Sequence, residues 1–244
     1  MILKATTRLL FLVGLSGVGK STAVTALQSG GVPLTLLPNR RTLTDALIIP
    51  EVQRAAGQPV QAVTDRVTRF ELTRRYREAH PGGMVHALSL YLQTAPPSET
   101  DTLVFDNLRG LEEVRAGVNM FPDARFVLLD APPLVRASRL VERRDGFDQV
   151  PITGSRDIPF DEQLSSLEGF DEVFDAFDLA LELQGRPKDD VLKAVHIILS
   201  EARNYDGIAA AAYLRVVKSA QSFLHLNTFK MSVDEVRARI QDWL

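Results

Sequence analysis

The chain has 244 residues, of which 45% are hydrophobic and 24% are charged, and its net charge is −3. These proportions are typical of a soluble globular protein, and the length suits one large domain or one domain with a small extension. The acidic balance argues against a dedicated nucleic-acid-binding protein, which normally carries an excess of basic residues. Because the chain has no cysteine, disulfides, thiolate metal ligands and cysteine nucleophiles are excluded.

Neither a membrane span nor a leader peptide is expected from the sequence. No apolar run approaches the roughly 18 residues that a membrane-spanning helix needs. The first residues lead directly into a predicted strand at residues 8–13, which leaves no room for a signal peptide. We therefore expect a cytoplasmic protein.

The first predicted strand leads into the most informative segment of the chain, Gly14-Leu15-Ser16-Gly17-Val18-Gly19-Lys20-Ser21, which has the form GxxxxGK[ST]. A helix is predicted directly after it, over residues 22–28. A glycine-rich turn between a strand and a helix directs backbone N–H groups and the positive end of the helix toward one point, where a polyphosphate fits.

In such a loop, Lys20 would reach the β and γ phosphates and the Ser21 hydroxyl would ligate Mg²⁺. The sequence therefore predicts a site for ATP or GTP with Mg²⁺. The residues predicted to bind the nucleotide are Gly14, Ser16, Gly17, Val18, Gly19, Lys20, Ser21 and Thr22.

Predicted strands and helices alternate along the rest of the chain. Strands are predicted at residues 8–13, 32–37, 102–106, 125–130 and 178–183. Helices are predicted at residues 64–79, from 84 onward, and at 111–120, 133–144 and 188–200. This alternation is typical of an α/β protein with a parallel sheet covered by helices on both faces. We predict a three-layer P-loop NTPase fold with about five parallel strands.

The elements divide the chain into a P-loop domain over residues 1–203 and a C-terminal helical extension over residues 204–244. The extension has an apolar run around residues 208–217 and a capping box that begins at Ser232. It packs either on the core or on a partner, a second copy or another protein. Packing on the core is the more common arrangement for an apolar helical face.

The layout of residues 9–200 resembles that of P-loop nucleoside-monophosphate kinases, the group that includes adenylate, guanylate, thymidylate and dephospho-coenzyme A kinases. Four places carry the resemblance: Ser16–Thr22; Phe105-Asp106-Asn107-Leu108-Arg109 with Glu112-Glu113-Val114; Leu129–Pro133 with Arg136, Arg139, Arg143 and Arg144; and Phe177–Glu182. The resemblance implies an ATP-dependent kinase. It also implies that a helical, acceptor-binding segment at about 42–95 is inserted in the domain and that a segment at about 143–161 forms a lid.

Phosphoryl transfer mainly requires two substrates held in line and cations where negative charge develops. The expected catalytic residues are Lys20, Asp106, Arg139, Arg143 and Arg144. Asp106 would hold Mg²⁺, together with Ser21, or orient the acceptor. The alternative for Asp106 is a helix N-cap, and for each arginine a solvated helix face with ion pairs.

An anionic acceptor would be bound by arginines, with Arg40, Arg41, Arg66 and Arg109 as the candidates. The sequence lacks the acceptor-side arginine run of guanylate kinases, and Asp106-Asn107-Leu108-Arg109 stands in place of the Asp-Gly-Phe-Pro-Arg run of adenylate kinases. The sequence therefore does not name the acceptor.

A second function remains open. A stretch of fewer than 40 residues, Gly14–Leu27 with Leu36-Leu37-Pro38, also resembles the N-terminal P-loop domain of small-RNA adaptor proteins of the RapZ type. This resemblance implies a nucleotide-dependent regulator that would act through its C-terminal helices. A kinase acting on nucleic-acid ends is disfavoured by the acidic net charge.

Overall fold

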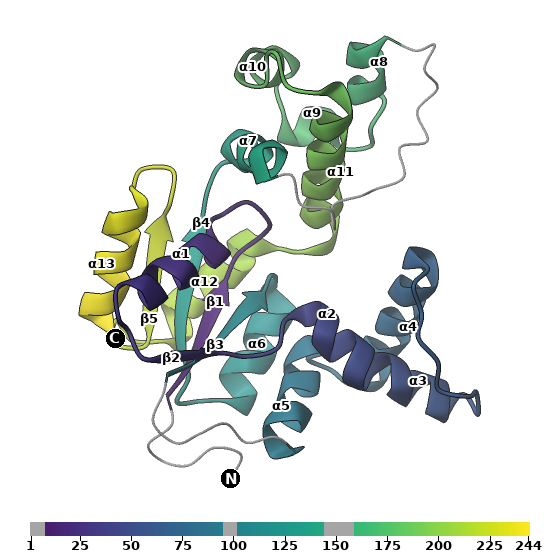
Figure 1. Ribbon diagram of the computed structural model, residues 1–244, viewed down its shortest axis with the longest axis vertical. Coiled ribbons are helices and arrows are strands. Elements are labelled where there is room, and N and C mark those ends of the chain that lie inside the picture. The colour runs from purple at the N-terminus through teal and green to yellow at the C-terminus, as the bar shows by residue number, and fades with distance from the viewer. Residues whose placement is uncertain (1–7, 95–101, 144–158) are drawn as a thin grey trace.

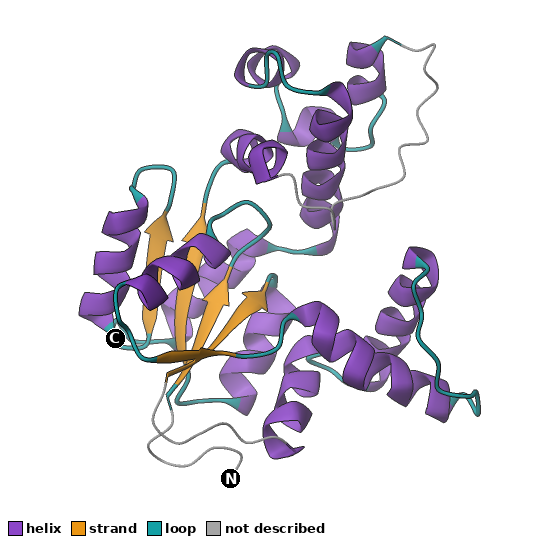
Figure 2. Cartoon of the chain, in the orientation of Figure 1, coloured by secondary structure: helices purple, strands orange, loops and turns teal. Residues whose placement is uncertain are grey.

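The computed structural model describes residues 8–94, 102–143 and 159–244, including all their side chains except those of residues 66 and 67. Five strands form one parallel sheet in the order β2-β3-β1-β4-β5 (Figures 1 and 2). The strands are β1 (Leu9–Val13), β2 (Leu34–Leu36), β3 (Thr102–Leu108), β4 (Arg125–Asp130) and β5 (Phe223–Asn227). The predicted α/β fold with about five parallel strands is confirmed.

Both faces of the sheet are covered by helices because residues along the central strands alternate between two cores. Leu10 and Leu12 of β1 face a core shared with α1 (Lys20–Ser29) and α13 (Val233–Trp243). Phe11 and Val13 face the opposite core, shared with α5 (Met84–Thr94), α6 (Leu111–Met120) and α12 (Gly207–Val217). Phe11 lies at the centre of that core, with its ring stacked 5.1 Å from Phe126 of β4.

Between β2 and α5 the chain forms a side arm, which extends away from the sheet (right in Figure 1). Its elements are α2 (Arg40–Leu43), the π-helical turn η1 (Thr44–Ile48), α3 (Ile49–Ala55) and α4 (Arg66–Ala79). The helices predicted over 64–79 and from Met84 are confirmed. However, α5 belongs to the layer under the sheet rather than to the arm, because Leu88 and Leu92 are fully buried in the sheet's core.

A second group of helices, the helical insert, stands between β4 and α12 (top in Figure 1). It contains α7 (Pro133–Arg143), α8 (Phe160–Ser165), α9 (Phe170–Val173), α10 (Ala176–Glu182) and α11 (Lys188–Asn204). These helices have a hydrophobic core of their own, with Phe170, Val195 and Ile198 at its centre. Most of the predicted lid segment, residues 144–158, lies outside the described residues.

The prediction of a strand at residues 178–183 is wrong, because this segment lies in and just after the helix α10. The apolar residues at 179, 181 and 183 have the period of a strand, but 179 and 183 also share one face of a helix. The structure buries Leu179 and Leu183 and leaves Leu181 63% exposed. The side chain of Asp175 caps the helix by accepting hydrogen bonds from the N–H groups of residues 177 and 178.

The fifth strand comes instead from the segment predicted to be a purely helical extension. β5 pairs in parallel with β4 along its whole length, and α13 packs on α1. The predicted capping box at Ser232 and Glu235 is confirmed at the start of α13. The last 41 residues therefore complete the sheet and pack on the core rather than forming a separate unit. No described helix is long and apolar enough to cross a membrane.

Candidate active site

The GxxxxGK[ST] segment forms the predicted loop between β1 and α1. Gly14, Gly17 and Gly19 have positive φ angles of 149°, 81° and 97°, which a side chain would strain. A Cβ at Gly17 would lie 2.8 Å from the backbone oxygen of Arg136 in α7. The loop therefore runs in close contact with the helical insert, and only glycine fits at that position.

Lys20 lies in the first turn of α1 and folds back over the loop. Its Nζ donates hydrogen bonds to the carbonyl oxygens of Gly14 (2.7 Å) and Leu15 (2.8 Å). Burial, with the positive charge of Arg109 adding to it, lowers the pKa of Lys20 to about 7, although the carboxylates of Glu201 and Asp106 act in the opposite direction. The ammonium group is thus poorly solvated, and the negative charge of a bound polyphosphate would stabilise its protonated form.

The outer side of the loop is held by α7 and by the turn after β5. Arg136 donates from Nε to the carbonyl oxygen of Ser16 (2.8 Å). Arg139 donates to the carbonyl oxygen of Gly17 (3.2 Å) and to both the hydroxyl (2.9 Å) and the carbonyl (3.0 Å) of Thr228. The Thr228 hydroxyl in turn donates to the carbonyl oxygen of Val18 (2.9 Å). These bonds satisfy the carbonyl groups of Ser16, Gly17 and Val18, and they hold the loop against α7 and the turn after β5.

Glu201, in the last turn of α11, is almost completely buried beside the same loop. Its carboxylate accepts hydrogen bonds from the N–H (2.9 Å) and the hydroxyl (2.7 Å) of Ser16. It also forms ion pairs with Arg136 (2.6 Å) and Arg109 (2.9 Å). One carboxylate thus connects the P-loop, the helical insert and the segment after β3.

Asp106 lies toward the carboxyl end of β3, the edge at which ligands of parallel α/β sheets bind. Its carboxylate accepts a hydrogen bond from the side chain of Asn107. Burial raises the pKa of Asp106, and the nearby ammonium of Lys20 opposes this effect. Among the described residues, no group of three His, Asp or Glu side chains is arranged to hold a metal ion.

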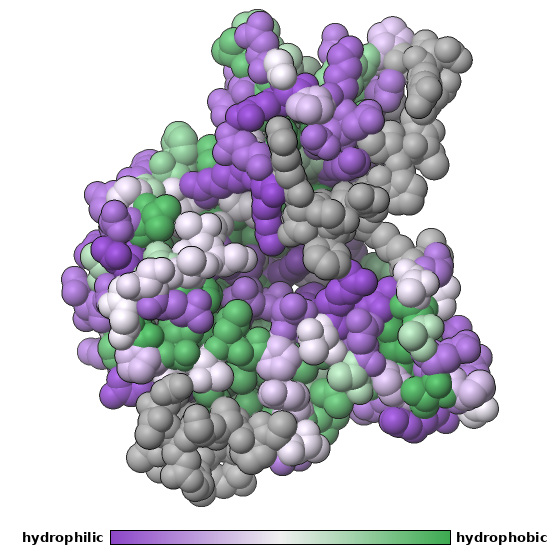
Figure 3. Space-filling model, viewed as in Figure 1, coloured by the Kyte–Doolittle hydropathy of each residue, from purple (hydrophilic) through white to green (hydrophobic). Residues whose placement is uncertain are grey.

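A cavity of about 1170 Å³ opens in front of the loop. Its walls come from the P-loop, from Asp106 and Asn107, from the side arm, from the helical insert and from the turn after β5. The arginines predicted to bind the acceptor or to act in catalysis that line this cavity are Arg40, Arg41, Arg109, Arg139 and Arg143. Arg69 of the side arm also lines it. Hydrophilic side chains lie on both sides of the hollow between the arm and the insert in Figure 3.

The predicted nucleotide-binding residues divide between two sides of the loop. Those that line this cavity are Ser16, Gly17, Gly19, Lys20, Ser21 and Thr22. Gly14 and Val18 line a second cavity on the other side of the loop. Arg144 lies outside the described residues, as does the side chain of Arg66.

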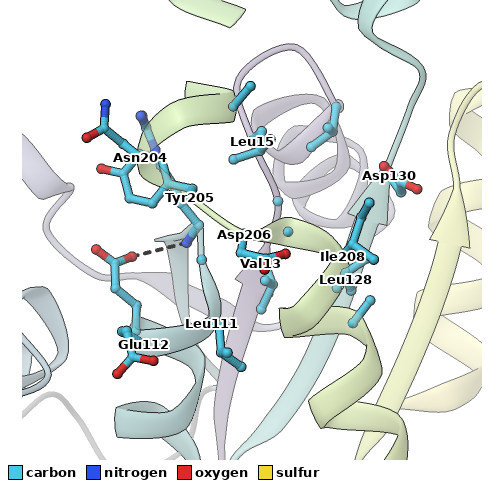
Figure 4. Close-up of a pocket in the computed structure, with 18 of the residues that line it drawn as sticks. Val13, Leu15, Leu111, Glu112, Leu128, Asp130, Asn204, Tyr205, Asp206 and Ile208 are labelled. Atoms are coloured by element: carbon cyan, nitrogen blue, oxygen red, sulfur yellow. Dashed lines mark hydrogen bonds between the residues drawn. The ribbon is translucent and has the colours of Figure 1, made fainter. Parts of the chain in front are cut away.

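The second cavity has a volume of about 1410 Å³ and lies at the carboxyl ends of β1 and β4. Figure 4 shows Leu15, Leu111, Leu128 and Ile208 around it, with Tyr205 from the junction between α11 and α12. Arg109 lines both cavities and places its guanidinium 5.7 Å from the centre of the Tyr205 ring.

Three partners of the site were not predicted from the sequence. Glu201 and Thr228 are single polar residues with no motif around them, and Glu113 forms an ion pair with Arg40 and accepts from the N–H of Arg109 (3.1 Å). Glu113 belongs to the Glu112-Glu113-Val114 run that carries part of the kinase resemblance, but no role was assigned to it there. Nothing local marks the other two, since their partners are 65 or more residues away.

No family model matches the chain, and neither does any curated protein. Among solved structures, it is similar to a sugar kinase from Janibacter sp. HTCC2649, with 14% identity over 97% of this chain and 94% of that one and a TM-score of 0.41. It is also similar to shikimate kinase from Bacteroides thetaiotaomicron (15% identity, 96% and 97% covered, TM-score 0.41). A sulfotransferase from Alicyclobacillus acidocaldarius matches comparably (13% identity, 96% and 76% covered, TM-score 0.40). At these values we take neither an activity nor a substrate from them.

Proposed function

We propose that this protein is an ATP- and Mg²⁺-dependent phosphotransferase that transfers the γ-phosphoryl group to a small, phosphorylated acceptor such as a nucleotide. The observation that carries the proposal is the composition of the 1170 Å³ cavity, in which a P-loop, a strand-end aspartate and arginines from two helical groups face one space. Phosphoryl transfer needs this combination because it depends on positioning and on neutralising charge.

The donor side of the cavity fits a magnesium nucleotide. The positive φ angles of Gly17 and Gly19 shape a concave loop at the N-terminus of α1, a suitable setting for phosphate oxygens. Lys20, Ser21 and Asp106 lie at this end of the cavity, where Ser21 and Asp106 would hold Mg²⁺. When bound, the magnesium nucleotide supplies the transferable phosphoryl group and part of the countercharge.

The acceptor side lies toward the side arm. Arg40, Arg41 and Arg69 line the cavity there, together with Phe70, whose ring is 54% exposed. An exposed aromatic ring beside guanidinium groups suits an acceptor that has both a flat ring and an anionic group. From the insert, Arg143 approaches the same space.

The test is release of ADP from Mg·ATP, measured against a panel of nucleoside monophosphates, dephospho-coenzyme A and small sugars. We expect one class of acceptor to stimulate release, and we expect Lys20→Ala to abolish it. Stimulated release that survives Lys20→Ala would show that the site is wrongly assigned. Nucleotide binding with no stimulation by any acceptor would favour the second candidate.

The second candidate is a P-loop regulator that acts by binding another protein. Exposed apolar side chains on α12 favour it, because Ile208 and Val216 are 87% and 85% exposed and lie eight residues apart on the same face. Truncation of residues 204–244 cannot test this function, since it removes β5. The variants Ile208→Ser and Val216→Ser keep the sheet intact, and their loss of partner binding with unchanged nucleotide affinity is the expected result.

A further inference from the structure

Glu201 places a negative charge among groups that a phosphoryl group would use. Its four donors are the Ser16 N–H, the Ser16 hydroxyl and the guanidinium groups of Arg109 and Arg136. Two of these donors belong to the third residue of the P-loop, and the two arginines flank it. A carboxylate with four donors has all its lone pairs satisfied, so the arrangement is stable while no nucleotide is present.

The negative charge of Glu201 also acts on Lys20, at the end of the cavity where the phosphates are proposed to bind. Among the carboxylates near Lys20, Glu201 has the largest influence on that ammonium. Ser16 and Arg109 both line the cavity in front of the loop, whereas Glu201 itself does not. The terminal phosphoryl group of a triphosphate at this loop would therefore approach both the donors that Glu201 occupies and the negative charge it carries.

We propose that Glu201 is an internal anionic competitor for the terminal phosphoryl group, so that a nucleoside triphosphate, but not a diphosphate, displaces it from Ser16. The inference rests on the proposed nucleotide binding and concerns the regulation of that site. A diphosphate leaves the Ser16–Glu201 contact in place because it carries no third phosphoryl group. A triphosphate must break the contact and satisfies Ser16 and Arg109 in its stead.

The contact connects nucleotide state to the position of the helical insert. Glu201 lies in α11, and Arg136 and Arg139 of α7 hold the carbonyl groups of Ser16 and Gly17. A ligand shifts an equilibrium between two arrangements only by its difference in affinity for them. Here the difference lies in the third phosphoryl group, so α11 is released from the loop in the triphosphate-bound state alone.

The test compares the dissociation constants of Mg·ADP and of the magnesium complex of β,γ-imido-ATP, measured by calorimetry. We expect Glu201→Gln to bind the triphosphate about tenfold more tightly relative to ADP, since a like charge is removed near the terminal phosphoryl group. Hydrogen exchange over residues 188–204 should increase with the triphosphate and not with ADP in the native protein.

The matched control is Glu168→Gln, because Glu168 is also paired with the helical insert, through Arg203 of α11 (2.6 Å), but lines neither cavity. It should leave the ratio of the two dissociation constants unchanged. If Glu201→Gln fails to fold, Glu201→Asp keeps the charge, withdraws the carboxylate from Ser16 and should tighten triphosphate binding by a smaller factor. An unchanged ratio in the folded Glu201 variant would overturn the proposal and leave the proposed function standing. Failure of native protein and variant alike to bind either nucleotide would overturn both.

Discussion

The lowered pKa of Lys20 predicts that nucleotide binding takes up a proton. In the free protein this pKa is about 7. A bound polyphosphate places negative charge beside the ammonium and raises the pKa, so the complex holds the proton more tightly than the free site. By linkage, affinity is greatest below pH 7 and falls as the pH rises through that value.

The size of the effect follows from the same pKa. Between pH 6 and pH 8 the protonated fraction of the free site falls from about nine-tenths to about one-tenth, so the dissociation constant of Mg·ADP should rise about tenfold over this range. At pH 7, binding should take up about half a proton per site. Calorimetry in two buffers that differ in ionisation enthalpy measures the proton directly, and a pH series measures the affinity.

The nucleotide has titrating groups of its own, and Lys20→Arg separates the two contributions. An arginine stays charged over this range, so the variant reports the nucleotide alone and should show a flatter pH profile. Equal profiles for the native protein and Lys20→Arg, with no proton uptake, would show that Lys20 is already protonated in the free loop and that burial does not perturb it.

Three further predictions concern turnover, the loop and the core. Arg143→Ala should lower turnover more than nucleotide affinity, because Arg143 lines the cavity opposite the side arm; comparable losses in both would place it in nucleotide binding instead. Gly17→Ala should weaken nucleotide binding at least tenfold as measured by calorimetry, because φ of Gly17 is 81° and a Cβ there would lie 2.8 Å from the backbone oxygen of Arg136. An affinity equal to that of the native protein would show that the loop and α7 move apart freely. Ile240→Ala should lower the free energy of unfolding by about 2–5 kcal/mol, since Ile240 of α13 is fully buried; a urea titration with an unchanged midpoint would mean that α13 does not belong to the core.

The local sequence was sufficient to predict the central strands of the sheet and the loop between β1 and α1. The apolar runs of β1, β3 and β4 are continuous because these strands are buried on both faces, and a GxxxxGK[ST] segment between a strand and a helix has a single well-defined geometry. The positions of Lys20, Ser21 and Asp106 at one end of one cavity follow from these patterns. So do the helices at residues 111–120 and 64–79, whose boundaries the structure reproduces to within two residues.

Long-range pairing decided what local patterns left ambiguous. The segments at residues 178–183 and 223–227 are both short and partly apolar, so local pattern does not distinguish them. The second segment becomes the fifth strand because it pairs with the open backbone edge of β4, whereas the first forms α10. The same holds at the site, where Glu201 reaches Ser16 across 185 positions of the chain. A buried carboxylate needs partners to offset its lost hydration, and those partners are brought together only by the tertiary fold. The sequence by itself thus determined the strand, the glycine-rich loop and the helix that follow one another at residues 9–29, and the tertiary structure decided which charges surround that loop.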